Sequence, residues 1–293
     1  MSRFYRRPIT TPAAGRAVRD VFRPFVSLLS DFGARDPSAA IMRGVVLAIA
    51  PDAIVVDVTH DVDKFAVKDG ALLLWCALPY LAVGAHVGVV DPGVGTERYG
   101  IAIEVARGDV LIGPDNGLLI PGAERLGGIV RAHLLENGQY RLPVVTSSFH
   151  GRDLFAPAAA HVALGVPIEA LGRPLDPGRL VRLPWPRVEI RDGVLDTAIV
   201  YLDTFGNVKL EGSVQDLSDA LGPMEFGDEL EITLEGRDGA VPVVWAETFG
   251  RVQPGQALLY EDSYGRLCVA ENQGSAVDRL RLQDGQSVRI ERV

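Results

Sequence analysis

Hydrophobic and polar positions follow two different patterns along the chain. In the first half, short aliphatic runs alternate with stretches in which apolar residues recur at helical spacing. Such alternation predicts βαβ units, and therefore a mostly parallel sheet with helices on both faces. The expected strands are residues 25–30, 53–58, 85–90, 100–105 and 109–113, and the expected helices are 39–49, 67–78 and a segment from Arg152 onward.

The second half lacks the helical period. A proline-rich stretch after Pro174 indicates a linker, and short β-rich runs separated by Gly, Asn and Asp turns follow it. We therefore predict an α/β chain, with an N-terminal α/β/α sandwich and a smaller C-terminal antiparallel β-barrel. The predicted boundaries are a leader at 1–24, a first domain at 25–175, a linker at 176–190 and a β-rich domain at 191–293.

Composition narrows the classes of function. The 293 residues are 47% hydrophobic and 23% charged, which is typical of a globular protein. The net charge of −9 disfavours nucleic acid and anionic membranes as partners. No run reaches the ~20 apolar residues of a membrane span, and the Arg-rich start lacks the apolar centre of a secretion signal. Cys76 and Cys268 lie in apolar runs, so we expect buried, reduced thiols and a cytoplasmic location.

Candidate chemistry lies in loops that follow the predicted strands, where open parallel sheets bind ligands. Asp31 comes directly after the first strand and suits ribose hydroxyls or a cationic group, whereas Asp36 suits a helix cap. Asp91 and Arg98 flank a loop rich in glycine after the third strand. These two charges indicate either a functional pair or a turn with a surface ion pair.

Two further loops carry polar groups. Asn116 lies in an Asn-Gly turn, which is an ordinary turn signal but also offers an amide to a ligand. His150 lies in a glycine-bearing turn at a helix start, a place suited to acid–base chemistry. His60 is a weaker candidate in a loop, and the histidines inside apolar segments are predicted to be structural: His86, His133 and His161.

The β-rich half offers two loops, each open to two interpretations. Residues 202–208 form either a hairpin corner or a ligand loop, and the amides in 271–276 suit either a turn or the edge of a nucleobase. The chain contains no GxxxxGK[ST], HExxH or GxSxG motif. Phosphate-loop, zinc-peptidase and hydrolase-elbow chemistry are therefore disfavoured, and no set of metal ligands is apparent in the sequence.

Together these motifs resemble the S-adenosylmethionine (SAM) hydroxide adenosyltransferase family, which is related to the SAM-dependent chlorinases and fluorinases. The resemblance extends over almost the whole chain after residue 24 and keeps the order of the motifs. They are SDFG (30–33), VVDVTHDV (55–62), VDPGVGTER (90–98), GPDNGLL (113–119), FHGRD (149–153), DTFGN (203–207) and ENQGSA (271–276).

The resemblance implies an enzyme that hydrolyses SAM to adenosine and methionine, with SAM as substrate and no cofactor. It also implies a homotrimer whose sites lie between one subunit's first domain and a neighbour's second. The catalytic residues would be Asp91, Arg98 and His150. In this scheme water attacks the ribose C5′, Asp91 and His150 polarise the water, and Arg98 holds the carboxylate.

The same resemblance implies a set of substrate-binding residues. Asp31 would bind the ribose hydroxyls, and three residues would line the pocket: Phe65, Phe149 and Gly151. Asp203 and Asn207 would bind the amino-acid end of methionine. The adenine would contact Phe205 and Phe249, with Asn272 and Gln273 at its edge.

Two alternatives remain at the level of sequence. The first is a SAM-dependent halogenase, whose members carry a Tyr or another uncharged residue at the position of Asp91. A carboxylate there would repel a halide at close range, which favours water as the nucleophile. The second is a non-catalytic protein that binds SAM or adenosine, and the presence of all three catalytic side chains disfavours it.

Overall fold

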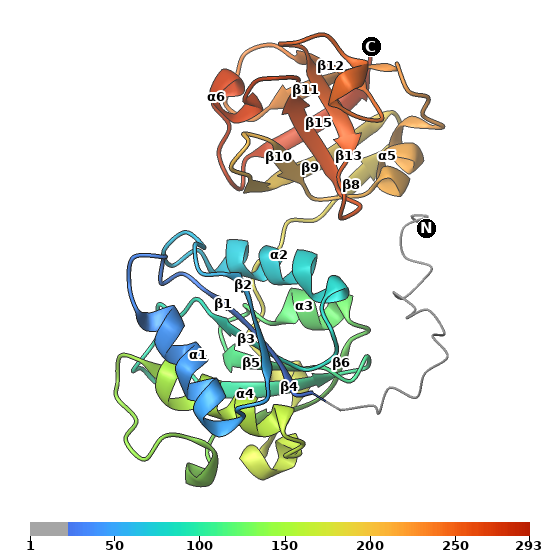
Figure 1. Cartoon of the computed structure of the whole chain (residues 1–293). Coiled ribbons are helices and arrows are strands. Elements are labelled where there is room, and N and C mark those ends of the chain that lie inside the picture. The colour runs from blue at the N-terminus through green and yellow to red at the C-terminus, as the bar shows by residue number, and fades with distance from the viewer. Residues whose placement is uncertain (1–22) are drawn as a thin grey trace, which may run out of the picture. The chain divides into compact units, whose positions relative to one another are not determined.

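The computed structural model of the chain describes residues 23–293, so the predicted leader lies almost wholly outside the described residues. The described chain divides into two compact units after Leu183 (Figure 1). The backbone N–H of Val181 donates to Asp115, so the chain up to this point packs on the first unit. The domain boundaries at 175 and 191 stay predictions.

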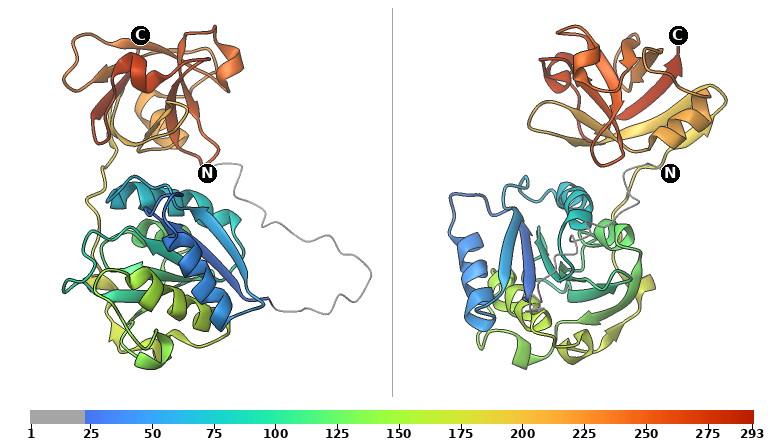
Figure 2. Two further views of the ribbon diagram at one scale, coloured as in Figure 1. Left: turned by 60° about the vertical axis from the view of Figure 1, so that its left-hand side comes forward. Right: turned by 45° about the vertical axis from the view of Figure 1, so that its right-hand side comes forward.

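The first unit is a seven-stranded sheet in the order β2-β1-β3-β5-β4-β6-β7. Helices α1 and α4 pack together on one face, and α2 and α3 on the other (Figure 2). The strands are β1 (Phe25–Ser30), β2 (Ile54–Thr59), β3 (Ala85–Val89), β4 (Gly100–Val105), β5 (Val110–Pro114), β6 (Ile129–Leu134) and β7 (Pro174–Leu175). The helices are α1 (Ser38–Ile49), α2 (Val67–Ala77), α3 (Ile120–Arg125) and α4 (Ala156–Ala163).

The predicted α/β/α sandwich is confirmed, with one difference in the sheet. Strands β2, β1, β3 and β5 are parallel, whereas β4, β6 and β7 extend the sheet with antiparallel pairings. Only residues 106–109 separate β4 from β5, too few for a crossover helix, so the two strands form a hairpin. Elements β6, β7 and α3 were not predicted.

The central strands are buried on both faces, as expected for parallel strands under two helical layers. A polar side chain inside such a sheet needs a partner. Ser27 on β1 therefore meets His86 on β3, with 2.7 Å between Oγ and Nδ1. His86 Nε2 in turn lies 2.9 Å from Oδ1 of Asp109. The prediction that His86 is structural agrees with this sealed position.

The second unit is the predicted β-barrel. Seven strands close in the order β9-β10-β14-β13-β12-β11-β15, and β8 pairs with β9 outside the ring. Every pairing is antiparallel except β12 with β13. The strands are β8 (Glu189–Arg191), β9 (Val194–Leu202), β10 (Val208–Leu210), β11 (Glu229–Leu234), β12 (Val241–Trp245), β13 (Ala257–Glu261), β14 (Leu267–Glu271) and β15 (Ser287–Arg292).

Two short helices interrupt this unit, α5 (Val214–Leu221) and α6 (Ala276–Leu280), where the sequence predicted only strands and turns. Helix α5 begins with a capping box, in which Ser213 and Asp216 each bind the other's backbone N–H. That Ser-x-x-Asp spacing is a helix signal that the β-rich interpretation overlooked. Among residues 23–293, no helix is long and apolar enough to cross a membrane.

Candidate active site

A cavity of about 330 Å³ lies at the carboxyl end of the parallel strands in the first unit. It is within the size range of small-molecule pockets. Six residues singled out from the sequence line it together: Asp31, Phe65, Asp91, Phe149, His150 and Gly151. Its other lining residues are Phe32, Lys64, Val89, Val94 and Ser148.

Asp91 follows β3 and forms an ion pair with Arg98 at the far end of the same loop. Arg98 Nε lies 3.0 Å from each carboxylate oxygen of Asp91, and Nη2 also contacts Oδ2. The two side chains are only 5% and 10% exposed, so this is not a surface ion pair. Because charge-assisted bonds of a guanidinium are directional, Arg98 fixes the orientation of the carboxylate.

Arg98 also contacts His150, which comes from a distant part of the sequence. Its Nη2 lies 2.8 Å from His150 Nδ1. A guanidinium can only donate, so Nδ1 is the acceptor and the ring proton lies on Nε2. Burial, reinforced by the charge of Arg98, lowers the pKa of His150 and favours this neutral ring. The site therefore offers an N–H donor from His150 and a carboxylate acceptor from Asp91.

The loop that carries Asp91 depends on close backbone packing. Gly95 has a φ of 78°, and a Cβ there would lie 2.4 Å from the carbonyl oxygen of Ser147. Only glycine allows this approach, which brings the loop against the segment that precedes His150. Asn116 donates from Nδ2 to the carbonyl of Val90 at 2.8 Å, so it supports the strand end beside Asp91.

The last three residues of the FHGRD motif begin a short π-helix, η4 (Gly151–Phe155), which follows His150 and continues into α4. Such turns are frequent at functional sites. Of its charged residues, Asp153 is fully buried and accepts hydrogen bonds from Thr146 and Arg152. Gly151 leaves little space, because a Cβ would lie 3.0 Å from Met42 Sδ. The motif therefore places His150 and Gly151 at the cavity and uses Asp153 to hold the preceding loop.

Asp31 and Phe65 meet through the backbone. The N–H of Phe65 donates to Asp31 Oδ2 at 3.0 Å, and Phe65 has a φ of 68°, a strained value for a residue other than glycine. Phe65 is 69% exposed. Among the other lining residues, Phe149 packs edge-to-face on Phe32, with ring centroids 5.6 Å apart.

Sequence reasoning missed several lining residues. Phe32 and Ser148 lie inside or beside motifs that it used, so proximity in sequence was the available signal. Lys64 adds a cation beside Phe65, but nothing in the local pattern distinguishes it from a solvated lysine. Asp36, in contrast, accepts from the backbone N–H of Ser38 at 2.8 Å, but the N-cap position of α1 is Pro37, so Asp36 lies one residue before the cap.

In the second unit, the loop between β9 and β10 holds three of the predicted residues. Asp203 Oδ1 accepts from the backbone N–H groups of Phe205 and Asn207, each at 2.9 Å. Its Oδ2 accepts from the Asn207 side chain, also at 2.9 Å. The loop is thus ordered by its own carboxylate, and it leaves Phe205 81% exposed at its tip.

The remaining predicted residues lie on neighbouring loops of the barrel. Phe249 packs on Tyr260, with ring centroids 5.0 Å apart. The Asn272 side chain is buried and donates to the carbonyl of Val252 at 2.7 Å, so its Nδ2 already has a partner within the barrel. Gln273 follows with a φ of 57°, in the left-handed region that favours glycine.

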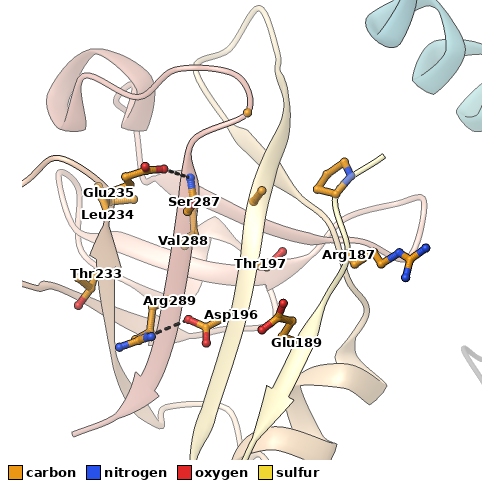
Figure 3. A pocket seen from close by; sticks show the side chains of 13 residues that line it. Arg187, Glu189, Asp196, Thr197, Thr233, Leu234, Glu235, Ser287, Val288 and Arg289 are labelled. Atoms are coloured by element: carbon orange, nitrogen blue, oxygen red, sulfur yellow. Dashed lines mark hydrogen bonds and ion pairs between the residues drawn. The ribbon is translucent and has the colours of Figure 1, made fainter. Parts of the chain in front are cut away.

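A larger cavity of about 540 Å³ lies on the barrel and holds none of the residues predicted for the site (Figure 3). Its charged side chains are largely used by neighbouring groups. Arg289 donates to Asp196 at 2.8 Å, and Glu235 accepts from the backbone N–H of Ser287. Size alone therefore does not identify the active site, whereas the convergence of the motif residues does.

Family models agree with both units. The SAM hydroxide adenosyltransferase N-terminal domain matches residues 26–172, and the C-terminal domain of the same family matches residues 197–289. The chain belongs to the SAM hydroxide adenosyltransferase family.

Individual relatives support this membership. An (R)-S-adenosyl-L-methionine hydrolase from Salinispora tropica is 40% identical over 91% of this chain and 97% of its own. A fluorinase from Actinopolyspora mzabensis is more distant, at 27% identity over 92% of this chain and 98% of its own. A crystal structure of a conserved protein from Thermotoga maritima superimposes with a TM-score of 0.85 at 29% identity, covering 91% of this chain and all of that one.

Proposed function

We propose that this protein hydrolyses SAM to adenosine and methionine by attack of water on the ribose C5′. The observation that carries the proposal is the contact of Arg98 with both Asp91 and His150 at one cavity. A carboxylate with one fixed orientation and a neutral imidazole form a site for a water molecule. The hydrolase names of two relatives that are 40% identical to this chain support the same reaction.

In the proposed mechanism, the carboxylate of Asp91 accepts the proton of the water while the oxygen forms the bond to C5′. The C5′–S bond breaks, and its electron pair leaves with methionine as a neutral thioether. His150 donates its Nε2–H to the water and orients it, because Arg98 occupies Nδ1. Asp91 and His150 therefore have different roles, whereas the scheme implied by the resemblance has both side chains polarise the water. Proton acceptance by a positioned side chain is worth about 10²–10⁴-fold in rate.

We assign the ribose hydroxyls to Asp31, because its Oδ1 is not used by the backbone N–H of Phe65. Phe65 and Phe149 contact the substrate from the cavity walls, and Asp203 with Asn207 binds the amino-acid end. We assign the adenine to Phe205, Phe249 and the loop at 272–273. Phe65 and Phe205 are exposed, so both side chains are accessible to a ligand.

We further propose that the (R)-epimer at sulfur is the preferred substrate. Support comes from the names of the relatives from Salinispora tropica and Thermus thermophilus, each 40% identical to this chain. Inversion at sulfur exchanges the directions of the methyl group and the amino-acid arm while C5′ stays in place. A pocket that fixes both the ribose and the amino-acid end therefore distinguishes the two epimers.

The test is to incubate the purified protein with each separated epimer, with and without chloride or fluoride, and to quantify the products by mass spectrometry. We expect adenosine and methionine at rates that do not depend on halide, with the (R)-epimer faster. A halide-dependent 5′-halo-adenosine would assign the protein to the halogenase branch. Intact substrate bound to the protein would indicate a binding protein without activity.

We propose a homotrimer in which a neighbouring subunit's second domain completes each site. Mixing the inactive variants Asp91→Asn and Asp203→Ala tests this arrangement. Because the two defects lie in different domains, each mixed trimer would contain one intact site of three. We therefore expect the recovered activity to reach at most about a third of the wild-type rate. Complete absence of recovered activity in proven mixed trimers would refute shared sites, and a monomer by ultracentrifugation would refute the trimer.

We also propose a cytoplasmic location and a reaction without metal or cofactor. The location is supported by Cys76 and Cys268, which are both buried thiols that form no disulfide. Burial raises the pKa of Cys268 to about 12, so this thiol is unreactive. The absence of a metal requirement is supported by the chemistry, because the sulfonium is already a good leaving group.

A further inference from the structure

Beneath the Asp31 loop lies a group of side chains that the mechanism does not use. Ser30 ends β1 and is fully buried, and its Oγ lies 2.7 Å from Nδ1 of His60. His60 Nε2 faces Asp57 on β2 at 3.2 Å, a close polar contact whose angles fall outside those of a well-formed hydrogen bond. Asp57 is paired with Arg43 of α1.

The direction of the hydrogen bonds in this group of side chains follows from its two ends. The carboxylate of Asp57 favours a proton on His60 Nε2, which leaves Nδ1 as the acceptor for the Ser30 hydroxyl. Ser30 Oγ in turn accepts from the backbone N–H of Phe32 at 3.4 Å, a long contact. The groups are therefore aligned in one direction, from the Arg43–Asp57 ion pair to the residues on both sides of Asp31.

The backbone of the same two loops is joined at further points. The Gly33 N–H donates to the carbonyl of His60 at 2.6 Å, and the Val62 N–H donates to the carbonyl of Ser30 at 3.4 Å. The Phe65 N–H completes the connection by donating to Asp31 Oδ2. His60 thus lies at the base of both loops. The segment that begins at His60 extends to Phe65, whose N–H contacts the Asp31 carboxylate.

We propose that His60 is a positioning residue that fixes the orientation of Asp31 for the ribose of the substrate. This proposal rests on the proposed function. The strained φ of Phe65 supports it, because a residue other than glycine keeps that conformation only where its surroundings impose it. Here the imposed conformation directs the Phe65 N–H to Asp31, and His60 holds the base of the loop that imposes it.

The test compares His60→Ala, His60→Asn, Asp31→Asn and the double variant His60→Ala/Asp31→Asn. For each we would measure kcat and KM with SAM and with its 2′-deoxyadenosyl analogue. The matched control is His161→Ala, which removes another partly buried histidine, on α4 outside the cavity. The selectivity for the ribose hydroxyl, given by the ratio of the two kcat/KM values, is a readout that general loss of stability would not move.

We expect His60→Ala to lower kcat/KM for SAM by about tenfold, as for one lost net hydrogen bond, mainly through KM. It should lose selectivity against the 2′-deoxy analogue, and His60→Asn should restore part of it because Asn still accepts from Ser30. The double variant should be no worse than Asp31→Asn, since both act through one carboxylate.

Three outcomes would overturn the proposal: wild-type selectivity in His60→Ala, strictly additive losses in the double variant, or the same loss of selectivity in His161→Ala. Failure of the proposed function would look different, because the wild-type protein itself would then release no adenosine. In that case adenosine binding by calorimetry replaces the kinetic readout, and unchanged affinity in His60→Ala would contradict the positioning role.

Discussion

Strand β1 carries a serine–histidine–aspartate chain at each of two positions, in different surroundings. Ser27 contacts His86, which contacts Asp109, and the side chains of this histidine and aspartate are both 0% exposed. Ser30 contacts His60, whose side chain is 11% exposed and lies under a loop that lines the cavity. The same chemical groups are sealed inside the sheet in one case and support a binding loop in the other.

The comparison shows that position in the sheet decides the role of such a chain. Burial opposes ionisation of Asp109, yet hydrogen bonds from His86 and Arg107 outweigh it and lower the pKa of Asp109 to about 2. That chain therefore contributes to stability, and this contribution is present above the ordinary pKa of 3.8 and lost as pH falls toward 2. The chain at His60 ends beside Asp31, so its effect should appear in substrate binding.

The largest expected effect comes from the cavity itself, where neither chain is disturbed. Asp91→Asn should lower kcat by about 10²–10⁴-fold, because it removes the proton acceptor while keeping the shape of the side chain. SAM binding should persist, as measured by calorimetry. The matched control is Asp115→Asn in the adjacent loop, a carboxyl whose pKa burial raises, and it should keep nearly the wild-type rate. A wild-type rate in Asp91→Asn would remove this residue from the mechanism.

His86→Ala should separate the two chains most clearly. It leaves Asp109 buried with fewer partners, so we expect a loss of about 3 kcal/mol in the unfolding free energy of the first unit. Urea unfolding measures this loss, with Ser27→Ala as a milder control of about 1 kcal/mol. At a temperature where the protein stays folded, selectivity for the ribose hydroxyl should not change. Lost selectivity in His86→Ala would show that the two chains are not distinct in function.

The pH profile tests the neutral state of His150. Burial and the charge of Arg98 lower its pKa from 6.5, so the neutral ring persists below that pH. As pH falls from 8, kcat/KM should stay level through 6.5 and decline only below it. The profile of His150→Gln should lack the decline that protonation of His150 causes. The lowered pKa of His150 would be contradicted if half of the activity were lost at or above pH 6.5 and His150→Gln did not show that loss.

Removal of metal ions is expected to have no effect on activity. Activity should survive dialysis against EDTA, because methionine leaves as a neutral thioether and needs no Lewis acid. Restoration by added Mg²⁺, Mn²⁺ or Zn²⁺ after a loss in EDTA would contradict the direct displacement. The rates before and after dialysis, normalised to the folded fraction, give the comparison.

Local motifs allowed the fold and much of the site to be predicted. The strands β1 and β4 agree with their predicted ranges because short aliphatic runs bounded by turns specify them. Asp91 and Arg98 lie seven positions apart in one loop. The sequence therefore indicated that they pair, either as a functional pair or as a surface ion pair of a turn. His150 was a candidate from its own turn, but its grouping with Asp91 and Arg98 came from the family resemblance. Its contact with Arg98 depends on the close approach of Gly95 to Ser147, which the sequence does not reveal.

The features that were missed depend on tertiary contacts or on weak local signals. The chain at His60 requires the pairing of β1 with β2, including a register shift between Leu28 and Leu29, which sequence spacing does not reveal. The parallel pair β12–β13 is likewise a property of barrel closure. Helix α5 differs, since its capping box at Ser213 was readable from the sequence.

The central claim is that water attacks C5′ in the cavity at Asp91. It is tested most directly by a turnover in H₂¹⁸O, with mass spectrometry of both products. The account predicts one ¹⁸O atom in adenosine and none in methionine, at a rate that falls with Asp91→Asn. Methylthioadenosine with labelled homoserine, or adenosine without label, would show that the bond is broken elsewhere or by another nucleophile.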